Sequence, residues 1–132
     1  MRRPFELERI DHILLLVRGM DRALAFYEGV LGAAVESRLP RYAMVELIAG
    51  ASRIDLVDVD EPHGAWARPP LPGGRNVDHF AVRLSSCDEA SLRSHLQAHG
   101  VTVVEERRES QGVSLYVRDP AGNTIELIAP RG

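Results

Sequence analysis

Hydrophobic and polar residues follow two periods along this chain, and the same succession of periods occurs twice. Strand-like patterning covers residues 8–18, and a helical stripe of apolar residues over 20–31 follows it, ending at Gly32. Three further short strands are predicted at 33–38, 42–49 and 53–59. The first module, residues 8–60, is therefore predicted to have the order β-α-β-β-β.

The second half repeats that order. A strand is predicted at 77–84 and a helix at 87–99, with Gly100 as its stop, and the three remaining strands are expected at 101–107, 113–118 and 123–129. The turn DPAGN joins the last two strands, and Gly122 is expected there with a positive φ. Residues 61–76 are rich in Pro and Gly and form the predicted linker. The chain, 1–132, is thus interpreted as one α+β domain whose second module is 77–129.

Composition excludes several function classes. The net charge is −3 with both signs interspersed, which gives no basic stripe for nucleic acid, and no apolar run is long enough to span a membrane. The N-terminal residues carry no signal-peptide pattern, so we expect a cytoplasmic protein. Cys87 is the only cysteine and the sequence contains no lysine, which excludes an intrachain disulfide, a thiolate metal cluster and a Schiff-base lysine.

Four ionisable residues occupy matching places in the two modules. His12 and His79 each follow an Asp at the start of an apolar run, while Asp55 and Glu126 each lie between aliphatic residues in a later strand. The two His-to-acid spacings are nearly equal. A carboxylate in the middle of a strand is costly to desolvate unless a cation or a donor satisfies it. Two imidazoles and two carboxylates, brought together by the repeat, predict a site for one divalent ion.

Each of these residues also has a purely structural interpretation. Asp11 and Asp78 could form turns, each His could cap a strand end, and the two acids could lie on a solvated sheet face. The repetition favours the metal site, because sheet packing does not require the same ionisable type at the same place in both modules. Imidazole and carboxylate ligands without sulfur suit Ni, Co, Zn, Mn or Fe(II), and the residues alone do not choose among them.

Four segments resemble the vicinal oxygen chelate superfamily: IDHILLLV, ALAFYEGVLG, DHFAV and SLYVRDPAGNTIELI. This superfamily includes glyoxalase I, fosfomycin resistance proteins, extradiol dioxygenases and bleomycin resistance proteins. The resemblance implies two tandem βαβββ modules that form a curved, cupped mixed sheet, with helices outside and a metal within. It places the metal ligands at His12, Asp55, His79 and Glu126. It also implies a homodimer, and it leaves open whether each site is completed by modules of one chain or of two.

Departures from the family patterns bear on the substrate. Glyoxalase I enzymes that bind glutathione carry an Arg and an Asn where this chain has Leu16 and Val59, so glutathione specificity is doubtful. Fosfomycin thiol transferases carry a hydroxyl residue where this chain has Leu14. Their basic, Ser-containing loop and Tyr-containing strand are matched in part by Arg107, Ser110 and Tyr116.

We therefore expect a glyoxalase-like enzyme with lyase or isomerase chemistry on a small substrate that chelates the metal through two oxygens. Glu126 is the candidate catalytic base, since a metal-bound carboxylate can take a proton from carbon. Tyr116, Ser114 and, in the linker, Trp66 are candidate substrate-binding residues. The alternatives are a metal-dependent resistance or dioxygenase-type enzyme acting on an epoxide or a catechol, and a metal-free drug-binding protein of the bleomycin-resistance type.

Overall fold

The computed structural model describes residues 10–67, 77, 79–85, 87–110 and 112–130. The first module contains four strands, one helix that begins as α and continues as π, and two short 3-10 turns: β1 (His12–Val17), α1 (Met20–Leu24), η1 (Ala25–Val30), β2 (Ala34–Leu39), η2 (Pro40–Tyr42), β3 (Met44–Ala49), β4 (Ser52–Asp58) and η3 (Pro62–Ala67). The second contains β5 (Phe80–Arg83), α2 (Glu89–Ala98), β6 (Glu105–Glu109), β7 (Gly112–Arg118) and β8 (Thr124–Pro130).

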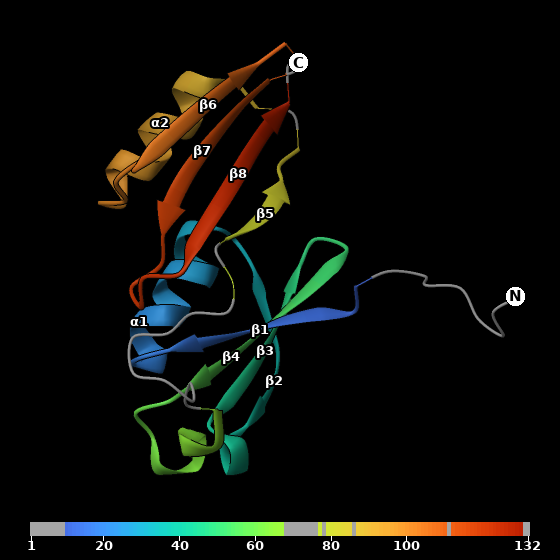
Figure 1. Ribbon diagram of the computed structural model, residues 1–132, viewed down its shortest axis with the longest axis vertical. Helices are drawn as coiled ribbons and strands as arrows, with labels where there is room; N and C mark the ends of the chain where they lie inside the picture. The colour runs from blue at the N-terminus through green and yellow to red at the C-terminus, as the bar shows by residue number, and fades with distance from the viewer. Residues whose placement is uncertain (1–9, 68–76, 78, 86, 111, 131–132) are drawn as a thin grey trace, which may run out of the picture.

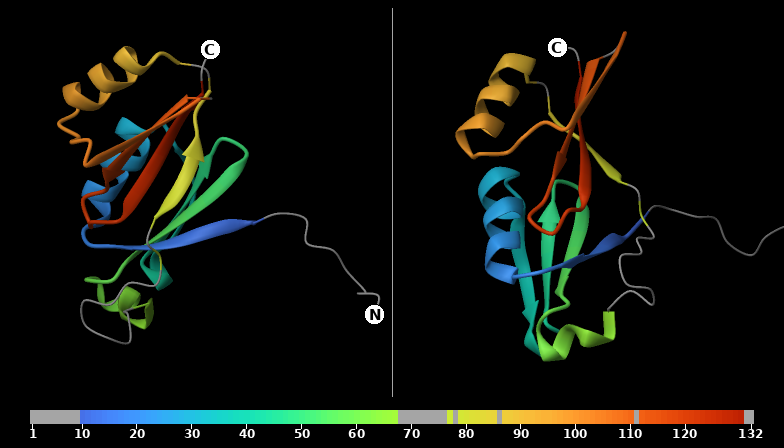
Figure 2. Two further views of the ribbon diagram at one scale, coloured as in Figure 1. Left: turned by 45° about the horizontal axis from the view of Figure 1, so that its top comes forward. Right: turned by 60° about the vertical axis from the view of Figure 1, so that its left-hand side comes forward.

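Each module forms its own four-stranded mixed sheet, and the two sheets have the same topology. The strand orders are β1-β4-β3-β2 and β5-β8-β7-β6, with a parallel first pair and antiparallel pairs after it. The first helix (α1 with η1) and α2 lie on one side of the two sheets, and within the described residues no α-helix covers the opposite faces (Figures 1 and 2). The α+β class and the tandem βαβββ modules are confirmed, although within one chain the sheets are two rather than one.

Alternation along the strands separates the core from the uncovered faces. Leu15, Val45, Leu56, Leu115 and Leu127 are buried against the helices. The residues directly before and after each of them in its strand point to the opposite face. The candidate site residues His12, Asp55 and Glu126 belong to that opposite set. The period-2 pattern therefore determines which side of each sheet carries polar chemistry.

Polar contacts fasten the two modules together next to the first helix. The buried Tyr27 hydroxyl donates to Asp119 Oδ2 at 2.8 Å, and Asn123 Nδ2 donates to the Leu16 carbonyl at 3.0 Å. Asp119 also accepts hydrogen bonds from the backbone N–H groups of Ala121 and Asn123, so the first residue of the DPAGN turn stabilises the backbone of that turn. Gly122 has φ 88°, as the turn pattern predicts.

Several predicted boundaries were wrong. The strand expected over 101–107 begins only at Glu105, because the N–H of Val101 bonds to the carbonyl of Leu96 at the end of α2. The linker expected over 61–76 contains η3, and its residues 68–76 lie outside the described part. The helix expected from Cys87 begins at Glu89, and its N-cap is Asp88, which accepts from the Ser91 N–H. No described helix is long and apolar enough to cross a membrane.

Candidate metal centre

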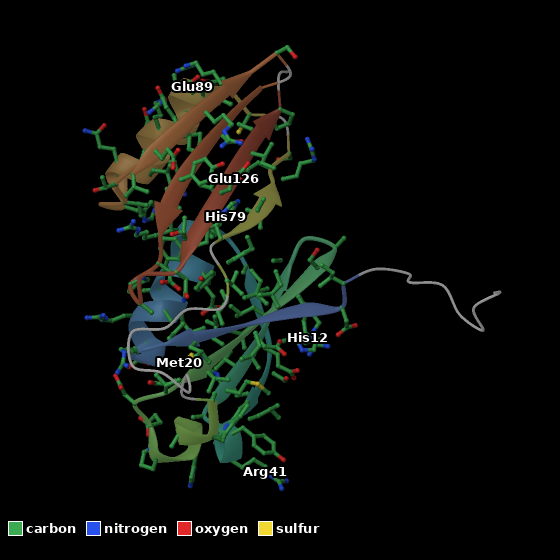
Figure 3. The ribbon with its side chains drawn as sticks, viewed as in Figure 1. His12, Met20, Arg41, His79, Glu89 and Glu126 are labelled. Atoms are coloured by element: carbon green, nitrogen blue, oxygen red, sulfur yellow. The ribbon has the colours of Figure 1, made fainter. Side chains whose placement is uncertain are left out.

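The register of β1 and β4 puts the first candidate pair, His12 and Asp55, on the uncovered face of the first sheet; His12 is labelled in Figure 3. His12 is aligned with Arg53 across the parallel β1–β4 pair, and Asp55 lies two residues further along β4, on the same face. His12 Nε2 is 3.5 Å from Asp55 Oδ2. The other ring nitrogen, Nδ1, is 2.8 Å from the carboxylate of Asp11. Asp11 of the DH sequence and Asp55 of β4 thus place a carboxylate on each side of the His12 ring.

The Asp11 contact assigns the tautomer of His12. A carboxylate accepts but does not donate, so Nδ1 carries the proton and a neutral ring turns the lone pair of Nε2 toward Asp55. Two lone pairs that face one another need a proton or a cation between them. The hydrogen bond to Asp11 raises the pKa of His12 despite some desolvation, and the negative charge of Asp55 raises it further.

Asp55 shows the clearest sign of a missing partner. The residue is 3% exposed, and its Oδ1 atom has no hydrogen-bond partner. Burial raises its pKa, and the nearby His12 opposes that rise only in part. A buried carboxylate oxygen without a donor costs free energy that a bound cation would recover. The donor set and the orphaned oxygen therefore fit a divalent ion.

Sequence analysis missed the polar residues that surround Asp55. Arg53 forms an ion pair with Glu46 on the neighbouring strand, and its guanidinium lies 3.9 Å from Asp55 Oδ1. Glu46 is aligned with Asp55 across β3–β4 and also accepts the hydroxyl of Ser37. The available signal was the spacing of two between Arg53 and Asp55, which puts both on one face of a strand.

The second pair repeats the geometry of the first on the other sheet. His79 directly precedes β5, and its Nε2 lies 3.3 Å from Glu126 Oε1. Ser114 donates to Glu126 Oε2 at 2.9 Å, and the Tyr116 ring lies edge-on to His79 with centroids 5.6 Å apart. Both candidate substrate-binding residues of β7 therefore lie beside the candidate base.

The electrostatics of the two acids differ. Burial opposes ionisation of Glu126, but hydrogen bonds from Ser114 and Tyr116, together with the charges of His79 and Arg107, outweigh it and lower the pKa of Glu126. The bond to Glu126 in turn raises the pKa of Tyr116. Glu126 is thus held ionised by donors of its own module, whereas Asp55 lacks such donors.

Within one chain the structure does not bring all four residues together, and the sequence left open whether the modules pair within one chain or between two. Among the described residues, no group of three or more His, Cys, Asp or Glu side chains is arranged to hold a metal. The structure brings His12 to Asp55 and His79 to Glu126, but each pair stays on its own sheet. Asp78, the repeat partner of Asp11, lies outside the described residues.

The structure places Trp66 away from the first pair. Its indole N–H donates to the Tyr42 carbonyl at 3.2 Å, and the two rings pack edge to face. This contact joins η3 to η2, at the end of the sheet where β3 begins, whereas His12 is aligned with the start of β4. The structure therefore gives Trp66 a contact within the first module and no contact with either candidate pair.

Two further histidines, one on α2 and one at its C-cap, lie outside the candidate pairs. His95 Nε2 lies 2.7 Å from the Val30 carbonyl at the end of the first helix, and the His99 ring lies 4.7 Å from that of His95. His95 therefore links the second module to the first. His99, which makes no such bond between the modules among the described residues, is the matched control histidine outside the candidate site.

The fold and the paired His–carboxylate sets define a tandem βαβββ protein with two candidate half-sites. The family model described as Glyoxalase/Bleomycin resistance protein/Dioxygenase superfamily matches residues 9–127. The chain belongs to this superfamily, which confirms the family resemblance of the sequence.

Relatives and solved structures agree with this assignment. Virulence protein STM3117 of Salmonella typhimurium is 34% identical over 127 residues, which cover 92% of this chain and 83% of that protein. Lactoylglutathione lyase of the same organism is 30% identical, with 91% of each chain covered. A variant of the fosfomycin resistance protein FosX from Listeria monocytogenes has a TM-score of 0.73 at 20% identity, over 95% of this chain and 92% of that one.

Proposed function

We propose that this chain is a metal-dependent, glyoxalase-like enzyme that acts on a small substrate. The observation that carries the proposal is the buried Oδ1 of Asp55, which accepts no hydrogen bond and has only a long ion-pair contact to Arg53, beside a His12 ring whose Nε2 lone pair faces the same carboxylate. A metal-free binding protein has no need to maintain that arrangement at a cost in stability. The FosX crystal structure contains Mn(II), which supports a divalent ion in this fold.

We infer that each complete site combines the first module of one chain with the second module of another. His12 and Asp55 would come from one chain, and His79 and Glu126 from its partner in a homodimer. This pairing accounts for two half-sites with matching geometry on separate uncovered faces. The ion would be Ni, Co, Zn, Mn or Fe(II).

The residues of the second module have distinct proposed roles. When bound, the ion would act as a Lewis acid on two oxygens of the substrate. Ser114 holds Oε2 of Glu126, so that Oε1 is the oxygen left to take a proton from substrate carbon and return it. Tyr116 would donate its hydroxyl hydrogen bond to substrate when Glu126 moves. Lyase or isomerase chemistry is the class that this arrangement serves best.

Two positions argue against glutathione as the substrate. Leu16 lies on the uncovered face of β1 and offers no charge to a carboxylate, and Val59 is 3% exposed and thus closed to a ligand. An enzyme with these residues would not bind glutathione as the glutathione-dependent members do. The substrate would then be held by other groups in the site.

Metal content tests the proposal. Tag-free protein, chelated and then offered each of the five ions, should retain one ion per chain by mass spectrometry. His79→Ala and Glu126→Ala should lose the ion without losing cooperative unfolding, whereas the control His99→Ala should keep it. Wild-type protein that retains none of the five ions, or unchanged metal in the two site variants, would overturn the assignment.

A further inference from the structure

The register of the two sheets shows a second set of equivalent positions, next to the metal pairs. In the first sheet, Leu16, Val57, Met44 and Leu39 form one row across four strands. In the second sheet, the row in the same relation to the His and the acid is Arg83, Ile128, Ser114 and Arg107. Each row begins four residues after the module's His and passes two residues beyond its acid.

The two equivalent rows differ completely at their ends. The first row is apolar at every position. In the second, the edge strands each place an arginine where the first module has leucine: Arg83 replaces Leu16, and Arg107 replaces Leu39. A duplicated sheet does not need this difference for packing, because all four of these positions face away from the core.

Within the described part of the chain, the arginines of the second row form no hydrogen bond or ion pair, although the charge of Arg107 helps to lower the pKa of Glu126. Neither Arg83 nor Arg107 has an ion-pair partner among the described residues, and both are exposed. The neighbouring Arg108, on the opposite face of β6, is held by Glu89 through two contacts of 2.8 Å. The chain therefore neutralises the arginine on the helix side and leaves the two on the site side available.

The separation of the arginines suits one anionic group. With strands roughly 4.8 Å apart, three strand spacings put the backbones of Arg83 and Arg107 about 14 Å apart, and extended arginine side chains can close on a ligand from both sides. Ser114 lies between them and already donates to Glu126. A carboxylate or phosphonate over this row would accept guanidinium donors.

We propose that the substrate is an amphipathic organic acid, with its oxyanion against Arg83 and Arg107 and its apolar body against the Leu16–Leu39 row of the facing module. The inference rests on the proposed function, since it uses the pairing of a first and a second module around one site. It names the substrate class that the lack of glutathione-binding residues leaves open.

The test begins with a set of simple ligands for the wild-type protein. Calorimetric titration would compare hexylphosphonate, hexanoate, methylphosphonate and 1-hexanol, in chelated protein and with Mn(II) added. Hexylphosphonate or hexanoate should bind at least about tenfold more tightly than 1-hexanol, and affinity should rise roughly two- to fourfold per CH₂ from methyl to hexyl phosphonate. The preference between the two acids identifies the oxyanion.

Matched arginine variants then locate the binding. Arg83→Gln and Arg107→Gln should each weaken binding of the preferred acid by roughly tenfold, because each removes a charged hydrogen-bond donor. Arg108→Gln is the control and should leave binding unchanged. Equal effects of all three variants, no effect of the first two, or no binding of any acid at millimolar concentration would overturn the proposal.

The metal content of the same variants separates the two hypotheses. Arg83→Gln and Arg107→Gln should keep one ion per chain while acid binding falls. If the metal is absent from the wild type, the proposed function fails whatever the acids do. If the metal is present and acid binding ignores the arginines, only the substrate inference fails.

Discussion

Asp55 and Asp58 are two buried acids on one strand for which the structure predicts stability effects of opposite sign. Asp55 is 3% exposed with an oxygen that lacks a hydrogen bond, whereas Asp58 is 5% exposed with both oxygens occupied. Asp58 Oδ2 accepts the Met20 N–H and Oδ1 accepts the Asp60 N–H, each at 3.0 Å. The substitutions Asp55→Asn and Asp58→Asn therefore compare a buried carboxylate that lacks a hydrogen bond with a buried carboxylate in the same strand whose two oxygens are both hydrogen-bonded.

Asp55→Asn should stabilise the chelated protein by about 1 kcal/mol at pH 8. A buried polar group without a hydrogen bond costs about 1–3 kcal/mol, and the uncharged Asn avoids part of that cost. The substitution also removes the weak attractions of the carboxylate to His12 and Arg53, which reduces the net stabilisation. Asp58→Asn should instead cost about 1–3 kcal/mol, since one of its oxygens becomes a donor that faces an N–H. For a chain of this size the expected shifts in Tm are roughly 3–5 °C per kcal/mol.

The pH dependence of Asp55→Asn follows from the raised pKa of Asp55. An acid whose pKa is raised by folding destabilises the native state when it ionises, so the advantage of Asn is complete above that raised pKa. It should shrink as pH falls and vanish below the ordinary value of 3.8, where both states are protonated.

The assay is denaturant unfolding of wild-type and variant proteins at one protomer concentration, in the presence of chelator, from pH 8 down to pH 4. Fixed concentration matters because assembly contributes to apparent stability. Destabilisation by Asp55→Asn comparable with that of Asp58→Asn would refute the reasoning, since Asp55 would then have a partner of its own. Addition of a tightly bound ion should reverse the ranking of wild type and Asp55→Asn.

Further predictions concern the rest of the fold and the site. Tyr27→Phe should cost about 1–2 kcal/mol by denaturant unfolding, because the buried hydroxyl donates to Asp119; an unchanged midpoint would show that this bond does not stabilise the packing of the modules. Hydrogen bonds from Arg108 and Arg93 lower the pKa of Glu89 to about 2, so Glu89→Gln should lower Tm at pH 7. That loss should fade as pH falls from 4.5 toward 2, where the wild-type carboxylate is protonated; a pH-independent loss would contradict the ion-pair account.

Much of the fold was predictable because local patterns decide it. Strict alternation set the core and the uncovered faces, and it placed His12 and Asp55 on one side of the first sheet. The turn residues fixed the DPAGN corner, where Gly122 takes the positive φ that its position requires. The start of β6 was predicted too early, because the N–H of Val101 bonds to the Leu96 carbonyl at the end of α2, and the first bond to β7 comes only from the N–H of Val104.

The candidate site was predictable only in halves. Each His and its acid come together because the parallel strand pair places the acid two residues further along, on the same face, and the repeat reveals this relation in both modules. Whether the halves meet within one chain or between two depends on how whole modules pack, and spacing along the sequence holds no information on that. The unpartnered Oδ1 of Asp55 likewise depends on neighbours from three strands.

The most direct test of the central account is the metal content of a mixed dimer. One chain would carry His12→Ala and Asp55→Ala, the other His79→Ala and Glu126→Ala, with different affinity tags that are removed after isolation of the heterodimer. Sites built between chains predict one ion per heterodimer and none in either mutant homodimer, because one of the two shared sites retains all four ligands. A heterodimer without metal, beside wild-type protein that binds one ion per chain, would contradict the account.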